Sequence, residues 1–247
     1  MLPQGYLSVS QVNKYLACPK SYAYKYIEGL PETIGSSLVV GQSFHKVIEE
    51  ANKRKMETGE LLNEEEIKSI YKAHWNSRVH EIDWKDDEDP EQEQERGLTL
   101  ANAYLNDIGK TLEPVGFETG FTVEVEEIPF KGYIDLMEAD GSIRDLKTSK
   151  KSPAKDTAEK SLQLTAYAHA YREMTGLKEK GCSLDYAVSL KTPKIVRLET
   201  EITEARIDRF KDTVWQVANA IEKGVFPRNE SGTACSYCSF KEFCKGE

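Results

Sequence analysis

The stretch Lys131-Gly-Tyr-Ile-Asp-Leu-Met-Glu-Ala-Asp-Gly-Ser-Ile-Arg-Asp-Leu-Lys-Thr148 decides the fold of this chain. Apolar and polar residues alternate over 132–137 and again over 143–148, which is typical of two strands with one buried face each. Between them, Asp140-Gly141 is a strong signal for a tight turn. The sequence therefore predicts an antiparallel hairpin.

The length of the turn decides which side chains meet. In an antiparallel pair, directly opposite residues point to the same face. A two-residue loop would place Asp135 opposite Leu146, whereas the three-residue loop 139–141 places Asp135 opposite Asp145. The longer loop ends in a residue of positive φ, a conformation that suits Gly141.

The longer loop also gives the hairpin a metal-binding character. Lys147 follows Asp145 by two residues and would share its face. Neighbouring carboxylates repel, and a hard divalent cation such as Mg²⁺ or Mn²⁺ relieves that repulsion while keeping several waters. A lysine beside such a cation can polarise water and stabilise charge on a phosphate. The alternative is a solvated hairpin with scattered charges, because Asp and Lys are common near turns.

These residues, followed by Gln163-xxx-Tyr167 in a helical segment, resemble the motifs of the PD-(D/E)xK nuclease superfamily. More narrowly, they resemble its RecB-like exonuclease branch, with Ile134 in place of the proline of the motif. The resemblance implies an α/β, restriction-endonuclease-like fold, with a mixed central sheet flanked by helices. It also implies a catalytic set of five residues: Asp135, Asp145, Lys147, Gln163 and Tyr167.

The resemblance assigns a role to each residue. Asp135 and Asp145 would bind Mg²⁺ or Mn²⁺, with the backbone carbonyl of Leu146 as a further ligand. Lys147 would position the attacking water and stabilise the developing charge. The Gln-xxx-Tyr pair would support the lysine and the substrate phosphate.

A histidine extends this predicted site. The pattern predicts a helix over 38–57, with His45 on or beside its apolar stripe. A lone histidine in such a place is usually a hydrogen-bonded core residue. Residues 41–45 resemble the first motif of the RecB-like branch, however, and that resemblance implies that His45 is a metal ligand. Glu49, one turn on, could orient it.

The remaining elements form one predicted nuclease domain over 1–247. A helical insertion at about 60–113 would cover one side of the site, and 117–200 would form the catalytic sheet core with a helix over 156–175. We expect that helix to begin with a capping box of Asp156 and Glu159, and Pro129 to mark the turn into the hairpin. His74 and His80 match no common helical face, so we expect them on the surface. Further helices are predicted at about 8–18, 63–82, 90–110 and 203–223, and strands at 117–126, 184–190 and 194–200.

The five cysteines predict a second metal centre. The pattern Cys235-xx-Cys238-xxxxx-Cys244 can surround one centre, with Cys18 as the best fourth ligand and Cys182 as a free buried cysteine. Spacing allows either zinc or an iron–sulfur cluster. The arrangement resembles the iron–sulfur nucleases of the AddB type and the CRISPR-associated adaptation nucleases. This resemblance implies a [4Fe–4S] cluster that ties the segment 233–247 to the first helix.

The charge and hydropathy of the chain limit the classes of protein to which it can belong. The net charge of −9 argues against a protein that coats nucleic acid, although basic residues gather over 144–160 beside the predicted site. No apolar run is long enough to span a membrane and no signal-peptide pattern appears, so a cytoplasmic protein is expected.

The sequence analysis leads to one principal hypothesis and one alternative. The first is a metal-dependent DNA exonuclease that acts on single-stranded ends, from the 5′ end, in recombination, repair or CRISPR-type processing. Its partners would be DNA and a helicase, a recombinase or a CRISPR adaptation protein. The alternative is a non-catalytic module, stabilised by an iron–sulfur cluster or zinc, that binds DNA or a helicase.

Overall fold

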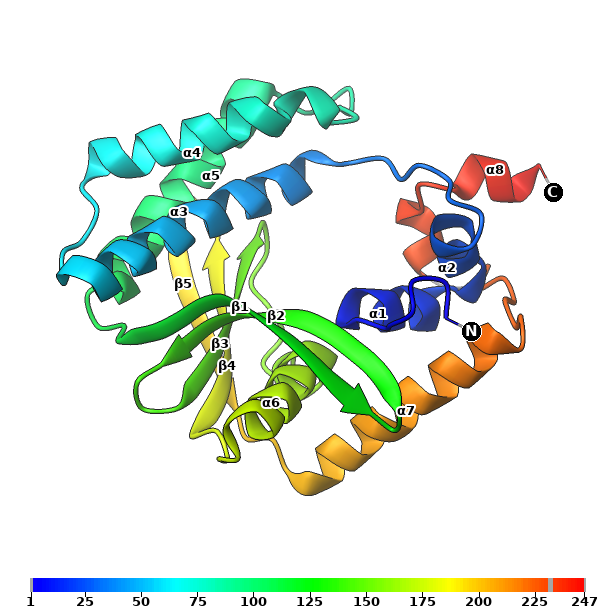
Figure 1. Cartoon of the computed structure of the whole chain (residues 1–247). Coiled ribbons are helices and arrows are strands. Elements are labelled where there is room, and N and C mark those ends of the chain that lie inside the picture. The colour runs from blue at the N-terminus through cyan, green and yellow to red at the C-terminus, as the bar shows by residue number, and fades with distance from the viewer. Residues whose placement is uncertain (1, 231–232, 247) are drawn as a thin grey trace.

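The computed structural model describes residues 2–230 and 233–246, which form a mixed sheet with helices on both faces (Figure 1). The five strands lie in sequence order, and only β3 and β4 are parallel. A parallel pair needs a long crossover, and α6 lies between these two strands in the chain. The mixed α/β sheet expected from the sequence is therefore confirmed. The strands are β1 (Pro114–Val125), β2 (Ile128–Glu138), β3 (Ser142–Ser149), β4 (Gly181–Val188) and β5 (Lys194–Thr200).

Two groups of helices cover the sheet. Helices α3, α4 and α5 lie over one face, and α1, α6 and α7 lie over the other (Figure 1). Each group encloses its own apolar core against the strands. In the described part of the chain, no helix is long and apolar enough to cross a membrane. The helices are α1 (Val9–Ala17), α2 (Pro19–Tyr26), α3 (Ser36–Thr58), α4 (Glu64–Arg78), α5 (Pro90–Tyr104), α6 (Leu162–Thr175), α7 (Glu204–Glu222) and α8 (Lys241–Lys245), with short 3₁₀ or π turns η1 (Val79–Glu81), η2 (Leu105–Gly109) and η3 (Thr233–Tyr237).

Helix α6 begins later than the sequence predicted. Its first turn is capped by Ser161, whose hydroxyl accepts a hydrogen bond from the backbone N–H of Leu164 at 3.2 Å. The expected capping box is wrong, because residues 155–160 form turns in which Asp156 pairs with Lys160 instead. These turns carry the chain from the end of β3 to the start of α6.

The connection between β1 and β2 also differs from expectation. Glu126 and Glu127 form a two-residue turn in which both have positive φ, of 50° and 64°. Such a turn matches the twist of a hairpin. Pro129 lies inside β2 and not at the turn, so that expectation is wrong. The carbonyl of Pro129 accepts a hydrogen bond from Leu7 at 2.9 Å, which ties the N-terminal segment to the sheet.

The two ends of the chain lie beside each other (Figure 1). The hydroxyl of Tyr15 donates to the carbonyl of Val225 at 2.6 Å. The ring of Tyr24 packs against Phe240 and Phe243, with centroids 5.5 and 5.1 Å apart. The buried tyrosines of α2 are therefore packing residues, and they bring the C-terminal segment onto the N-terminal helices.

Candidate active site

The turn between β2 and β3 has the three-residue form expected from the sequence. Gly141 adopts a φ of 86°, and the strand pairing places Asp135 opposite Asp145. Both carboxylates are buried, with 5% and 0% of their surface exposed. The strands separate at this point, and Asp135 Oδ2 accepts a hydrogen bond from the backbone N–H of Leu146 at 2.9 Å. A side chain thus takes the place of a backbone partner.

A chain of hydrogen bonds joins the two aspartates to helix α6. Lys147 Nζ lies 2.9 Å from Asp145 Oδ1 and 3.0 Å from Gln163 Oε1. Gln163 Nε2 donates to the hydroxyl of Tyr167 at 2.6 Å, and that hydroxyl donates to Asp135 Oδ1 at 2.9 Å. Gln163 and Tyr167 are one helical turn apart, so α6 presents both to the strands. The structure brings together all five residues of the predicted catalytic set.

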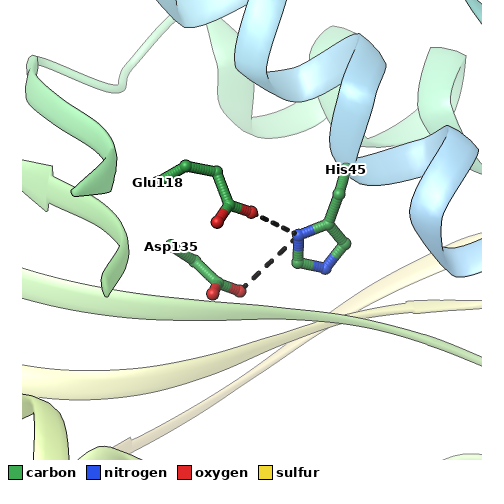
Figure 2. Close-up of side chains that lie close together, drawn as sticks. All are labelled: His45, Glu118 and Asp135. Carbon is green, nitrogen blue, oxygen red and sulfur yellow. Dashed lines mark ion pairs between the residues drawn. The ribbon is translucent and has the colours of Figure 1, made fainter. Parts of the chain in front are cut away.

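Helix α3 places His45 at the same point from the other side of the sheet. His45 Nε2 lies 2.9 Å from the carbonyl oxygen of Leu146. Figure 2 shows that Nδ1 faces two carboxylates, Glu118 Oε1 at 3.4 Å and Asp135 Oδ2 at 3.8 Å. The imidazole therefore lies between a backbone carbonyl and two acids, each of which is also a suitable metal ligand.

Glu118 is a site residue that the sequence analysis missed. Glu118 lies beside His45, where Glu49 was expected. Glu49 instead pairs with two lysines of its own helix. The pairing of β1 with β2 places Glu118 opposite Asp135, and its φ of 46° marks a local irregularity in β1. Alternation in the predicted strand 117–126 puts Glu118 on the polar face. The register to β2 would have identified it, but the glutamate turn gives no signal for that register.

The electrostatics of the site reflect an excess of negative charge. Burial, followed by the charge of Asp135, raises the pKa of Asp145 to about 7, although Lys147 opposes this. Burial would lower the pKa of His45, but Glu118 and Asp135 outweigh it and raise that pKa. Burial likewise opposes the charge on Lys147, yet the two aspartates raise its pKa, so the lysine is a cation at neutral pH. Asp145 Oδ2 makes no hydrogen bond in the described structure, although Lys147 Nζ is 2.8 Å away.

Comparison with known families agrees with this geometry. The sequence profile of the PD-(D/E)XK nuclease superfamily matches residues 6–245. The chain belongs to the PD-(D/E)XK nuclease superfamily. Within the described residues, His45, Glu118 and Asp135 each offer a ligand atom, and these atoms lie within 4.8 Å of one another. PD-(D/E)XK nucleases use divalent metals, and this group is the candidate metal site.

One solved structure has a fold similar to that of this PD-(D/E)XK protein. A candidate exonuclease from Eubacterium rectale has a TM-score of 0.66 and 13% identity, over 95% of this chain and 88% of the other. At that identity the likeness concerns the fold alone. A second structure, SSO0001, has 16% identity over 95% and 94% of the two chains, but its TM-score of 0.37 does not indicate a shared fold. No curated protein matches the chain.

Four of the five cysteines of this PD-(D/E)XK chain line one cavity of about 680 Å³ between the N-terminal helices and the C-terminal segment. The fifth, Cys182, is buried in β4, and burial raises its pKa to about 12. It is therefore the free buried cysteine expected from the sequence. The four that share the cavity are Cys18, Cys235, Cys238 and Cys244.

The candidate site adjoins a cleft of about 600 Å³ lined by α3, α4, Glu118 of β1 and residues 146–148 of β3. Its lining includes His45 of α3, Lys147 of β3 and His74 of α4. His74, expected on the surface, is partly exposed and lines this cleft. Its ring is partly buried, and Nδ1 lies 2.9 Å from the hydroxyl of Ser43, on the helix that carries His45. His80 is exposed as expected.

Proposed function

We propose that this chain is a Mg²⁺- or Mn²⁺-dependent DNA exonuclease. The single observation that carries the proposal is the meeting of Asp135, Asp145 and Lys147 with His45 at the edge of one cleft. Two buried carboxylates whose charges oppose each other fit a hard cation, because such a cation removes the repulsion. Without a bound cation, burial of two mutually repelling carboxylates would destabilise the fold.

The residues of the site would have two roles, metal binding and stabilisation of charge on the phosphate. His45, Glu118 and Asp135 would hold the metal together with Asp145 and the carbonyl of Leu146. The metal would supply Lewis-acid activation of water and of the phosphate. Lys147 is a partly exposed cation beside that position, and it would orient the water and stabilise negative charge that develops on the phosphate.

Gln163 and Tyr167 act as positioning residues. Gln163 Oε1 accepts from Lys147, and its amide donates to the tyrosine hydroxyl, so each end of the amide is fixed. Burial, then Asp135 and Asp145, raise the pKa of Tyr167 well above its usual range, so the hydroxyl keeps its proton and donates to Asp135. These bonds would hold the lysine and the carboxylate in a fixed relation.

We further propose that Cys18, Cys235, Cys238 and Cys244 bind a [4Fe–4S] cluster. Their common cavity supports the proposal. The spacing of the cysteines fits zinc as well, and the choice of a [4Fe–4S] cluster rests on the resemblance of the cysteine pattern to that of iron–sulfur nucleases. The cluster would act as a structural link between distant parts of the chain.

The proposed substrate, polarity, pathway and partners are based on the resemblance of the motifs to the RecB-like branch. We propose a single nuclease domain with a helical insertion at about 60–113, acting on single-stranded DNA from the 5′ end in the cytoplasm. Its pathway would be recombination, repair or CRISPR-type processing, beside a helicase, a recombinase or an adaptation protein.

The decisive experiment is cleavage of end-labelled single- and double-stranded DNA in Mn²⁺, Mg²⁺ or EDTA, with anaerobically purified protein. The native protein should release label only with metal, and the position of the label reports polarity. Lys147→Ala should lose at least about 100-fold in rate while it still binds DNA. Cleavage that persists in Lys147→Ala would contradict the mechanism, and no cleavage by brown, cluster-loaded native protein would favour a binding module.

A further inference from the structure

The cleft beside the active site has a lining that the chemistry of the metal site does not use. Beyond His45, Glu118 and residues 146–148 of β3, it is formed by α3 and by α4 of the helical insertion. Its Lys and Arg side chains are Lys46, Arg78 and Lys147, against two carboxylates, Glu49 and Glu118. With Glu118 assigned above to the metal, the three cations of the lining outnumber its remaining carboxylate, Glu49. Two further carboxylates, Glu50 and Glu81, pair with Lys46 and Arg78.

His74 is one of the residues that line this cleft. Ser43 belongs to α3 and His74 to α4, so the hydrogen bond between Ser43 Oγ and His74 Nδ1 joins the two helices. Ser43 is buried and lies two residues before His45. When Ser43 donates to Nδ1, the neutral ring carries its proton on Nε2. Nε2 makes no hydrogen bond to any residue in the described ranges, so it can donate to a ligand.

Two cations and one carboxylate act on His74. Burial lowers its pKa, and the charges of Arg78 and Lys46 lower it further, more than the charge of Glu49 raises it. The two cations therefore lie close enough to act on the same ring. A neutral donor flanked by two cations is suited to an anion and unsuited to a second metal ion.

The two cations have partners that an anion can replace at little cost. Lys46 pairs with Glu49 and Glu50 at 3.0 and 2.7 Å. Arg78 donates to both carboxylate oxygens of Glu81, at 2.8 and 2.6 Å. The side chains in these pairs are 21% to 37% exposed. Partly exposed ion pairs of this kind contribute little to stability, less than a charge-assisted hydrogen bond to phosphate.

We propose that Lys46, His74 and Arg78 form a second phosphate subsite, which binds a backbone phosphate beside the scissile one. The inference rests on the proposed nuclease function, because it names the part of the polynucleotide that the helical insertion recognises. It makes the insertion a substrate-binding wall. The ligand class is a polynucleotide strand with at least one phosphate beyond the bond that is cleaved.

The test compares two substrates that differ in the neighbouring phosphate. One is a labelled oligonucleotide, and the other is bis(p-nitrophenyl) phosphate, which has a single diester. Arg78→Ala should raise KM for the oligonucleotide about tenfold and reduce the slope of log affinity against log salt by about 1. It should leave hydrolysis of the small diester unchanged. Arg54→Ala removes a similar arginine of α3 that pairs with Glu60 and Glu66 outside this cleft, and it should change neither reaction.

A second variant separates binding from a merely structural role. Glu81→Gln frees Arg78 and should lower KM for the oligonucleotide, whereas loss of a structural ion pair would impair both substrates. Anisotropy of a labelled oligonucleotide in Ca²⁺ measures the subsite even if the protein cleaves nothing. Failure of native protein to cleave either substrate would count against the proposed function alone. Unchanged oligonucleotide binding in Arg78→Ala, or equal losses on both substrates, would overturn the subsite.

Discussion

Replacing Asp145 with asparagine should stabilise the metal-free protein at alkaline pH. The carboxyl is fully buried, and its pKa is raised from 3.8 to about 7. The folded protein therefore keeps this proton to a higher pH than the unfolded chain. By linkage, the free energy of unfolding falls as pH rises from 3.8 through 7, and the loss is complete above 7. At about 1.4 kcal/mol for each tenfold change in acidity, the loss is roughly 4 kcal/mol at pH 8.

Asparagine has the shape of the neutral acid, so Asp145→Asn should escape this loss. For a chain of this size, 1 kcal/mol corresponds to about 2–4 °C in Tm. Thermal unfolding in EDTA at pH 8 should therefore give the variant a Tm about 10 °C above the native protein. At pH 5 the difference should be less than half as large. Mn²⁺ at about 100 times its Kd should add about 2.7 kcal/mol to the native protein and less to the variant.

Asp140 in the same hairpin provides the matched control. Its hydrogen bond with Lys180 lowers its pKa to about 2, and its side chain is largely solvent-exposed. Asp140→Asn should therefore give no gain in Tm at pH 8. The reasoning is refuted if Asp145→Asn and the native protein melt together at pH 8 in EDTA, or if the native Tm does not fall between pH 5 and pH 8.

Three further predictions concern packing and burial. Arg197→Ala should lower the free energy of unfolding by about 3–5 kcal/mol, because it leaves the fully buried Asp185 without its cation. Arg197 donates to both carboxylate oxygens of Asp185, at 2.8 and 2.9 Å. In denaturant unfolding, Arg197→Lys should lose less stability than Arg197→Ala. Gly97→Ala should cost about 1–3 kcal/mol, because a Cβ there would lie 1.8 Å from the hydroxyl of Tyr71, and an unchanged denaturation midpoint would contradict that contact. Iodoacetamide at pH 8 should spare Cys182 in the native protein, because a pKa of about 12 leaves almost no thiolate; mass spectrometry before and after unfolding would show the difference.

Local sequence signals predicted the elements that depend on them. Gly141 fixed the length of the hairpin turn, and that length fixed the pairing of Asp135 with Asp145. The spacing of Gln163 and Tyr167 placed both on one side of α6. Each of these inferences needs only a turn rule or a helical period.

The residues missed by the sequence analysis depend on contacts between distant segments. Glu118 enters the site through the register of β1 on β2, and that register is set by a Glu126-Glu127 turn without the usual Asn or Gly. His74 reaches the cleft through its bond to Ser43, which depends on how α4 packs against α3. No local pattern encodes either contact.

The site owes its two-sided composition to an irregular point in the sheet. Residues two apart on a regular strand share a face, yet Ile134 belongs to the core beneath α6 and α7, and Leu136 to the core beneath α3. Asp135 lies between them, opposite Glu118, whose positive φ departs from regular strand geometry while the register of β1 on β2 stays the same on either side. Asp135 therefore contacts Tyr167 on α6 and approaches His45 on α3. A regular strand would give this carboxylate only one of those sets of partners, so the irregularity is what joins the proposed metal ligands to the residues that position the lysine.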